Sequence, residues 1–168
     1  MNRNIKNTFI CSDLHLGSNS TAVRRGFLNA GEQDKCIIDN WKKRITKRDS
    51  VIIIGDVAFS TDAWIKFINL PGFKKVVLGN HDEPKYVKML TENKVKIYGA
   101  MAARYNDIPI IITHIPVNPT TLNFRFRFNL HGHDHSNTDL GDKYLNFCIE
   151  LIDFEPKKLD EIEKWNTN

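Results

Sequence analysis

Short clusters of metal-ligand side chains recur along this chain, and they limit the possible folds more than any other feature. The clusters are Asp13-Leu14-His15, Gly55-Asp56, Gly79-Asn80-His81-Asp82, His114 and Gly132-His133-Asp134-His135. Each cluster except the last directly follows an apolar run, and this pattern is typical of turns at one edge of a sheet. The remaining histidine, His131, lies two residues before His133. The sequence therefore predicts one site assembled from distant segments.

Apolar runs and turn signals predict strand–helix alternation followed by strand-rich sequence. Strands are expected at residues 8–11, 51–54, 75–78, 95–102, 108–113, 124–130 and 144–152, and helices at 33–45, 60–70 and 84–92. The continuous β-branched run at 51–54 predicts a strand that is covered on both faces. The alternation of Phe and Arg at 124–128 predicts a half-buried strand with Phe inward and Arg outward, and the alternative is an arginine that contacts substrate phosphate. Together these elements indicate an α/β fold, a β-sandwich with helices on its outer faces.

Length and composition favour a single globular domain over residues 1–168. Hydrophobic residues make up 41% of the chain and charged residues 26%, as in soluble globular proteins. No apolar stretch approaches the roughly 18 residues of a membrane span, and the N-terminal segment lacks the apolar core of a signal peptide. With three cysteines and no close pair, we expect a cytoplasmic protein without disulfides. The net charge of +4 favours an anionic substrate.

The order of the clusters resembles the signature of the calcineurin-like metallophosphoesterases, which reads DxH, GD, GNH[D/E], a lone His and GHxH. The segment E-Q-D-K-C-I-I-D-N-W at 32–41 and the C-terminal F-E-P-K-K-L-D-E-I are similar to the small stand-alone bacterial and phage branch of that family. That branch often has a second His shortly after DxH, whereas this chain has Gly17-Ser18-Asn19, so no ligand is expected there. The resemblance implies a four-layer αββα β-sandwich flanked by helices.

The resemblance also implies a dinuclear metal site. One Asp must bridge the two ions, and Asp56 is expected in that role. The mixture of oxygen and nitrogen donors suits two divalent ions of Mn, Fe, Zn, Co or Ni, with Mn expected first, and a water or hydroxide between the ions would be the nucleophile. The implied ligands of the first ion are Asp13, His15, Asp56 and His135, and those of the second are Asp56, Asn80, His114 and His133.

His81 is similar to the catalytic histidine of the family, and it is expected to assist the leaving oxygen. The neighbouring Asp82 is expected to orient the His81 imidazole and to favour its protonated form. Arg24 and Arg25 are expected on the solvated surface, and a loop that contacts phosphate is the alternative.

These residues predict a phosphoesterase that acts on a small phosphoester, with diesters favoured over monoesters. A nuclease is the alternative within the same chemistry. A nucleic-acid partner is not favoured, because the chain lacks a long basic segment interleaved with aromatic residues. A non-catalytic metal-binding scaffold, like the retromer subunit with a similar fold, is the alternative of another class, and the presence of His81 argues against it. No membrane partner is expected, and the oligomeric state is left open.

Overall fold

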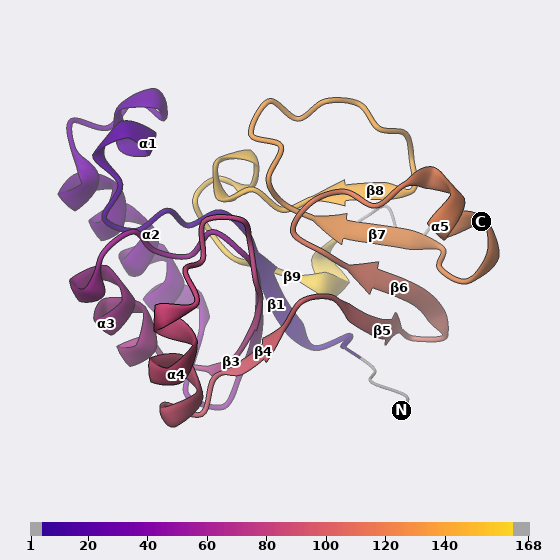
Figure 1. The fold of residues 1–168 in the computed structure, drawn as a ribbon, viewed down its shortest axis with the longest axis horizontal. Coiled ribbons are helices and arrows are strands. Elements are labelled where there is room, and N and C mark those ends of the chain that lie inside the picture. The colour runs from indigo at the N-terminus through magenta and orange to yellow at the C-terminus, as the bar shows by residue number, and fades with distance from the viewer. Residues whose placement is uncertain (1–4, 163–168) are drawn as a thin grey trace.

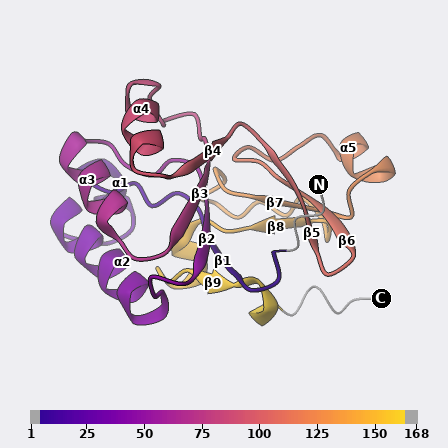
Figure 2. The ribbon, with the colours of Figure 1, turned by 90° about the horizontal axis from the view of Figure 1, so that it is seen from below.

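Two β-sheets packed face to face form the centre of the molecule (Figures 1 and 2). The computed structural model describes residues 5–162. The larger sheet has the strand order β4-β3-β2-β1-β9, and β9 is antiparallel to β1 while the other pairs are parallel. Its strands are β1 (Thr8–Cys11), β2 (Ser50–Ile54), β3 (Phe73–Val77), β4 (Lys96–Tyr98) and β9 (Lys157–Lys158).

The second sheet has the strand order β5-β6-β7-β8. Strands β5 and β6 form an antiparallel hairpin, and β6, β7 and β8 run parallel to one another. The hairpin turns at Asn106, whose positive φ of 50° is a conformation that Asn tolerates better than most residues. The strands are β5 (Met101–Tyr105), β6 (Ile108–Ile112), β7 (Phe128–His131) and β8 (Tyr144–Asn146).

Helices cover the outer face of the five-stranded sheet (Figure 2). Asn29 caps helix α2, and its side chain accepts from the Glu32 amide. Ser60 caps helix α3, and its side chain accepts from the Ala63 amide. These are common N-caps, since both side chains satisfy amides that the helix leaves unpaired. The helices on this side are α1 (Asn19–Arg24), α2 (Ala30–Arg44), α3 (Thr61–Asn69) and α4 (Lys85–Glu92).

Strand β2 separates two hydrophobic cores, because its successive side chains point to opposite faces. Val51 and Ile53 join the core between the sheet and the helices, which includes the fully buried Trp41 and Trp64. Ile52 and Ile54 join the core between the two sheets. The prediction that this β-branched run is covered on both faces is confirmed.

Helix α5 (Pro119–Phe124) lies between β6 and β7 in the chain, and the segment before it packs on the second sheet. The Val117 amide donates to the Asn129 side chain at 2.9 Å, and its carbonyl accepts from the Tyr144 hydroxyl at 2.8 Å, so this segment lies over β7 and β8. The predicted fold class, an α/β sandwich of two sheets flanked by helices, is confirmed. No helix within residues 5–162 combines the length and the apolar character that crossing a membrane requires.

Three of the predicted strands are wrong in extent. The strand at 95–102 is two strands, β4 and β5, which belong to different sheets because the chain crosses between them after Tyr98. The strand at 144–152 ends at Asn146, and the chain continues into two short 3-10 helices, η1 (Ile149–Ile152) and η2 (Leu159–Glu161), on either side of β9.

The strand at 124–130 is wrong over its first half, because α5 extends into it. The Asn118 side chain caps this helix by accepting from the Thr120 amide, and Pro119 occupies the first turn, where proline is favoured. The helix ends at Phe124, and strand β7 begins only at Phe128. Phe124 is 94% exposed, so the prediction that these Phe side chains point inward fails here.

Candidate metal centre

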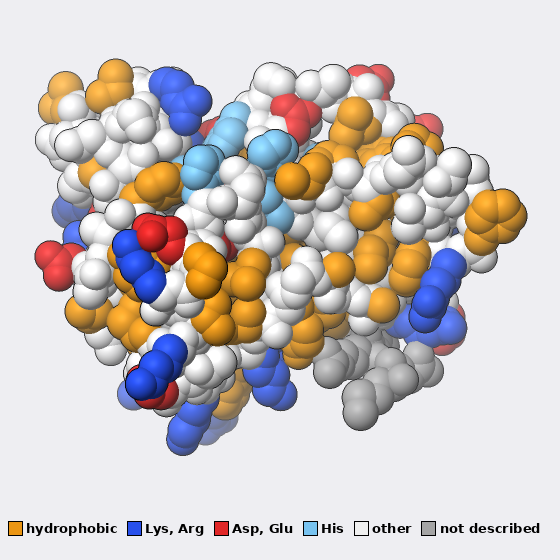
Figure 3. All heavy atoms as spheres, in the orientation of Figure 1, with side chains coloured by type: hydrophobic (Ala, Val, Ile, Leu, Met, Phe, Trp, Pro, Cys, Tyr) orange, Lys and Arg blue, Asp and Glu red, His pale blue; other side chains and the backbone are white. Residues whose placement is uncertain are grey.

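The predicted ligand clusters all follow the carboxyl ends of parallel strands. Asp13 and His15 come after β1, Asp56 after β2, and Asn80 after β3. His114 and His133 come after β6 and β7 of the second sheet, whose ends meet the same edge. The histidines gather at one place on the surface (Figure 3). The structure therefore brings the distant clusters together, as the sequence predicts.

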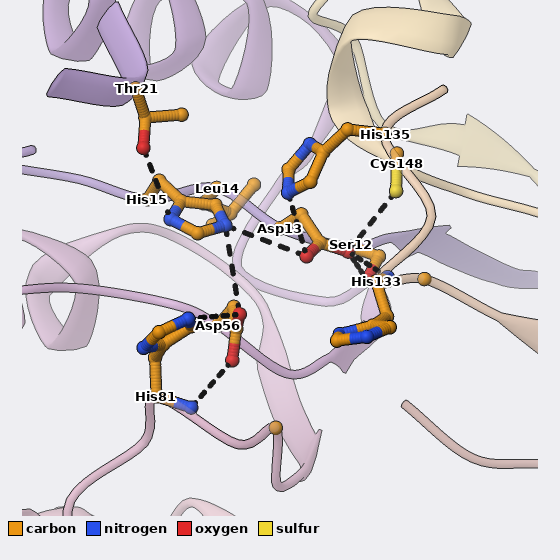
Figure 4. A network of polar contacts seen from close by, with 12 residues as sticks. Ser12, Asp13, Leu14, His15, Thr21, Asp56, His81, His133, His135 and Cys148 are labelled. Atoms are coloured by element: carbon orange, nitrogen blue, oxygen red, sulfur yellow. Dashed lines mark hydrogen bonds and ion pairs between the residues drawn. The ribbon is translucent and has the colours of Figure 1, made fainter. Parts of the chain in front are cut away.

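One group of donor atoms surrounds the free oxygen of Asp13 (Figure 4). His15 Nε2 lies 3.5 Å and His135 Nε2 lies 3.6 Å from Asp13 Oδ1. His15 Nε2 is also 3.7 Å from Asp56 Oδ2. Two donors that bind one ion at about 2.1 Å are about 3.0–3.4 Å apart in octahedral or tetrahedral geometry. The spacing of these four side chains thus fits a single cation with little movement.

A second group of donor atoms shares Asp56 with the first. His114 Nε2 lies 3.5 Å from Asp56 Oδ2 and 3.0 Å from Asn80 Oδ1. The His133 ring packs edge-on against His114, with ring centroids 5.2 Å apart. Because the same Asp56 oxygen faces both groups, this carboxylate is placed where a bridging ligand is needed.

Two buried polar atoms at the centre have no hydrogen-bond partner within residues 5–162, and both face the first group of donors. They are Asp13 Oδ1 and His15 Nε2. The other carboxylate oxygen, Asp13 Oδ2, accepts from the His133 amide at 2.9 Å, from the Cys148 thiol and from the Ser12 hydroxyl. An unpaired buried polar atom is costly, and a cation would satisfy both atoms at once. The residues therefore fit a metal ion.

The electrostatics of the second group also favour a positive charge. His114 Nδ1 lies 2.8 Å from the Ile54 carbonyl, so this nitrogen donates and Nε2 faces the Asp56 carboxylate. Burial lowers the pKa of His114, but the hydrogen bond to Asp56 and the charges of Asp13 and Asp56 outweigh burial and raise the pKa to about 9. Burial likewise opposes ionisation of Asp13, yet its hydrogen bonds and the nearby His114 hold its pKa below the usual range.

Four of the candidate ligands adopt a left-handed backbone conformation. The φ angles are 55° at Asp13, 48° at His15, 50° at Asp56 and 69° at His133. Residues other than glycine rarely adopt such angles, and they are found where the surrounding structure enforces them, often at functional sites. Two backbone hydrogen bonds hold the loops after β1 and β2 together, from the Asp13 amide to the Gly55 carbonyl and from the His15 amide to the Asp56 carbonyl, both 3.0 Å. The His133 amide is held by Asp13 Oδ2 at 2.9 Å.

Glycines allow these segments to approach one another. Gly55 has φ of 73°, a left-handed conformation that glycine adopts without strain. At Gly132 the reason is space, because a Cβ would lie 1.8 Å from Ser12 Oγ and 2.2 Å from Asp13 Oδ2. Gly79 has the same role against Asp56, where a Cβ would lie 2.2 Å from Oδ1.

His81 lies next to Asp56, beside the donor groups (Figure 4). Its side chain is 52% exposed, and its Nε2 is 3.9 Å from Asp56 Oδ2. Its amide donates to Asp56 Oδ1 at 2.9 Å, which fixes the backbone beside the candidate bridge. The imidazole packs against Phe59, with ring centroids 5.3 Å apart. His81 is therefore accessible to a molecule bound over the donors.

Asp82 does not orient His81, so that prediction is wrong. Its buried carboxylate accepts from the amides of Asp56 at 3.0 Å, Val57 at 2.9 Å and Gly79 at 2.9 Å. The chain turns at Asn80 and His81, so adjacent side chains leave in different directions. Burial raises the pKa of Asp82 more than these amides lower it. Asp82 instead ties the loop after β3 to the loop after β2.

Glu150 supports His135, a role that no motif in the sequence predicts. Glu150 on η1 hydrogen-bonds His135 Nδ1 and forms a 2.7 Å ion pair with Arg25. The Arg25 guanidinium also donates to the Asp13 carbonyl at 2.7 Å, and its side chain is 4% exposed. The prediction that Arg25 lies on the solvated surface is wrong, because its guanidinium is held inside by Glu150 and the Asp13 carbonyl. No spacing signal in the sequence links Glu150 to His135, since their contact depends on the packing of η1.

Replacing Glu150 with Gln should weaken metal binding by about 10–100-fold, the usual effect of removing a carboxylate that supports a ligating histidine. Affinity would be measured by titrating Mn²⁺ into the metal-free protein in a calorimeter. Glu155→Gln is the matched control, because Glu155 forms an ion pair with Arg44 away from the centre. Equal affinities for Glu150→Gln and the control would contradict a supporting role for Glu150.

Comparisons with known proteins identify relatives over part or most of the chain. No protein-family model matches it. The gene 66 proteins of Mycobacterium phages D29 and L5 are 33% identical over 85 residues and 32% identical over 88 residues. Each match covers 48% of this chain and 42% of the phage protein, so the chain aligns with less than half the length of these relatives. An uncharacterized protein of Methanocaldococcus jannaschii is 26% identical over 175 residues, covering 95% of this chain and 91% of that protein.

Two solved structures share the fold. A protein of unknown function from Aquifex aeolicus superposes with a TM-score of 0.76 at 22% identity, covering 94% of this chain and 98% of that chain. An archaeal phosphodiesterase superposes with a TM-score of 0.54 at 18% identity, covering 83% of this chain and 81% of that chain. These likenesses concern the fold alone. The chain is thus an α/β protein that shares its fold with these two proteins, and groups of Asp and His that could hold a metal ion lie at one edge of it.

Proposed function

We propose that this chain is a dinuclear metal-dependent phosphoesterase. The observation that carries the proposal is the shared Asp56 oxygen between two groups of oxygen and imidazole donors, one of which holds two unpaired buried atoms. The motif order that resembles the calcineurin-like metallophosphoesterases also supports it. We assign Asp13, His15, Asp56 and His135 to one ion, and Asp56, Asn80, His114 and His133 to the other. Such a pair of ions would lower the pKa of a water and neutralise charge on a phosphoryl group.

The mixed oxygen and imidazole donors suit Mn, Fe, Zn, Co or Ni, and we take Mn as the first ion to test. Cys148 is the one thiol beside the candidate ligands in the described part of the chain, since it groups with His135 and Glu150. Burial raises the pKa of the Cys148 thiol far above its usual value, and the charge of Asp13 raises it further. The Cys148 thiol already donates to Asp13 Oδ2 at 3.3 Å, so we assign Cys148 as a hydrogen-bond donor rather than a ligand.

His81 is the residue that we assign to the leaving group. Its ring is half exposed and lies beside the candidate bridge Asp56, so it can reach a substrate oxygen from the solvent side. A protonated imidazole at this position can donate its proton to the departing oxygen. Asp82 has no part in this step, because its carboxylate is occupied by backbone amides.

Phosphodiesters are the substrate class that the surrounding charges support. A monoester dianion needs extra cationic donors near its free oxygens. Arg25 is already paired with Glu150, and Lys85 with Glu83 at 2.8 Å. Arg24 lines a cavity of about 410 Å³ next to His135. Arg24 is thus one cation beside the metal centre, and one cation suits the single charge of a diester better than the two charges of a monoester.

Side-by-side kinetics test this proposal. With saturating Mn²⁺, we expect a higher kcat/KM for bis(p-nitrophenyl) phosphate than for p-nitrophenyl phosphate, and no turnover of either after chelation. Ni²⁺ and Zn²⁺ would be compared in turn. A clear monoester preference would contradict the diester assignment, and its loss in Arg24→Ala would identify Arg24 as a phosphate clamp. Two bound metals without turnover of any ester would instead support a non-catalytic scaffold.

A further inference from the structure

A second exposed surface lies at the opposite end of the four-stranded sheet from the metal centre. It consists of the end of α5, the chain that leads into β7, and the β5–β6 turn, and we call it the α5 patch. These segments line a cavity of about 630 Å³. Hydrophobic and basic side chains gather at this end of the molecule (Figure 3). The patch includes Phe124, Arg125, Phe126, Arg127 and Lys143.

The aromatic side chains of the α5 patch are available for stacking. Phe124 is 94% exposed, the largest value among the exposed large hydrophobic residues of the described chain. Phe126 is partly exposed two residues later. A large apolar ring held in solvent at the end of a six-residue helix contributes nothing to the core. Its position is explained if a flat group packs on it.

The cations of the patch are free to bind an anion. Within residues 5–162, neither Arg125 nor Arg127 forms an ion pair, and each guanidinium instead lies near a ring, 5.4 Å from the centroid of Phe126 and 5.9 Å from that of Phe128. The Lys143 ammonium donates to the Asn123 side chain at 3.5 Å and forms no ion pair within the described residues. Asp107 is the one acidic residue that lines the cavity, so three cations face one carboxylate.

The patch is separate from the metal centre. Its floor is formed by Ile108 and Phe128, at the amino ends of β6 and β7. The candidate ligands His114 and His133 follow the carboxyl ends of the same strands. Strand β7 from Phe128 to His131 alone spans roughly 10 Å, and His133 lies beyond its carboxyl end. A ligand on the patch therefore does not need the metals.

We propose that the α5 patch binds single-stranded nucleic acid. Alternating Phe and Arg supply both requirements of such a ligand, since unpaired bases stack on exposed rings and guanidinium groups neutralise the phosphates. A duplex would hide the base faces from Phe124. An acidic peptide would use the cations but would leave the exposed rings without a partner. This assignment does not depend on the proposed phosphoesterase activity, because binding is measured without metal.

Fluorescence anisotropy with a fluorescein-labelled dT12 strand, in EDTA so that no cleavage occurs, tests the proposal. Phe124→Ala should weaken binding about 5- to 100-fold, the usual effect of losing one stacked base. The double variant Arg125→Ala/Arg127→Ala should reduce the slope of log K against log salt concentration by about 1.4, at about 0.7 for each phosphate contact with a single strand.

Matched controls come from the opposite side of the molecule. Phe73→Ala removes another exposed ring (68% exposed), and Lys42→Ala/Lys43→Ala removes two exposed charges of α2, and both should leave binding unchanged. The proposal would be overturned if the controls lost as much affinity as the patch variants, or if Phe124→Ala kept its affinity for dT12. It would also be overturned if a 12-base-pair duplex, poly-glutamate or phosphatidylserine vesicles bound more tightly than dT12. Loss of dT12 binding with normal diester hydrolysis separates this proposal from the proposed function.

Discussion

Asp56→Asn is expected to weaken the binding of both metal ions. The loss of affinity should exceed the roughly 10–100-fold that is usual when a residue supporting a metal ligand is removed. Asp56 Oδ2 lies 3.7 Å from His15 Nε2 and 3.5 Å from His114 Nε2, so one atom serves both groups of donors. Asn has nearly the same shape, and its oxygen can still accept from the His81 amide. The substitution removes the charge and can place an N–H toward the ions. Elemental analysis after dialysis against Mn²⁺ gives the number of ions bound per chain.

The matched control for this experiment is Asp62→Asn. Asp62 is an exposed carboxylate in the first turn of α3, and its loss should leave the metal content unchanged. Undiminished occupancy of two ions in Asp56→Asn would contradict the assignment of Asp56 as the bridge. Loss of one ion alone would restrict Asp56 to a single site.

His81→Ala is expected to keep both metals and to lower the turnover of an alkyl phosphodiester by about 10²–10⁴-fold, the usual worth of general acid–base assistance. The loss should be smaller with p-nitrophenyl esters, because p-nitrophenolate leaves readily without a proton. The comparison of the two leaving groups separates proton donation from other roles. Steady-state kcat for each ester, with metal content measured on the same samples, provides the test.

Chemical rescue adds a second readout for His81. The His81 side chain is half exposed, so its removal opens the site to solvent. Added imidazole should therefore restore part of the alkyl-ester turnover of His81→Ala and have no such effect on the parent protein. Equal losses on good and poor leaving groups, without rescue, would mean that His81 binds phosphate rather than protonating the leaving group.

The strands that carry candidate ligands could be predicted because their signals are local. The apolar runs that end at Cys11 and Ile54 form β1 and β2, as expected. The alternation at 124–128 failed because a short period-two pattern competes with a helix signal, and the cap at Asn118 decided the outcome. Local alternation does not reveal which of two signals the tertiary structure favours.

The candidate ligands could be named from sequence, whereas their supporting residues could not. Glu150 contacts His135 only because η1 packs beside the loop after β7. Asp82 was assigned to the wrong partner because the direction of its side chain depends on the turn at Asn80, which adjacency in sequence does not specify. Roles that depend on backbone direction or on distant packing need the structure.

Four candidate ligands have a left-handed backbone, namely Asp13, His15, Asp56 and His133. This conformation lowers the stability of the fold at the positions where the proposed function needs a ligand. Such a conformation costs about 1–2 kcal/mol at each residue other than glycine, so glycine at these four positions would suit the fold alone. Glycine has no donor atom, and an evolving lineage can relieve the strain only by giving up the ligand. A bound ion would offset part of this strain by mass action, with about 2.7 kcal/mol at a concentration 100 times its Kd. Metal supply would then govern how much of the protein stays folded, as well as how much of it is active.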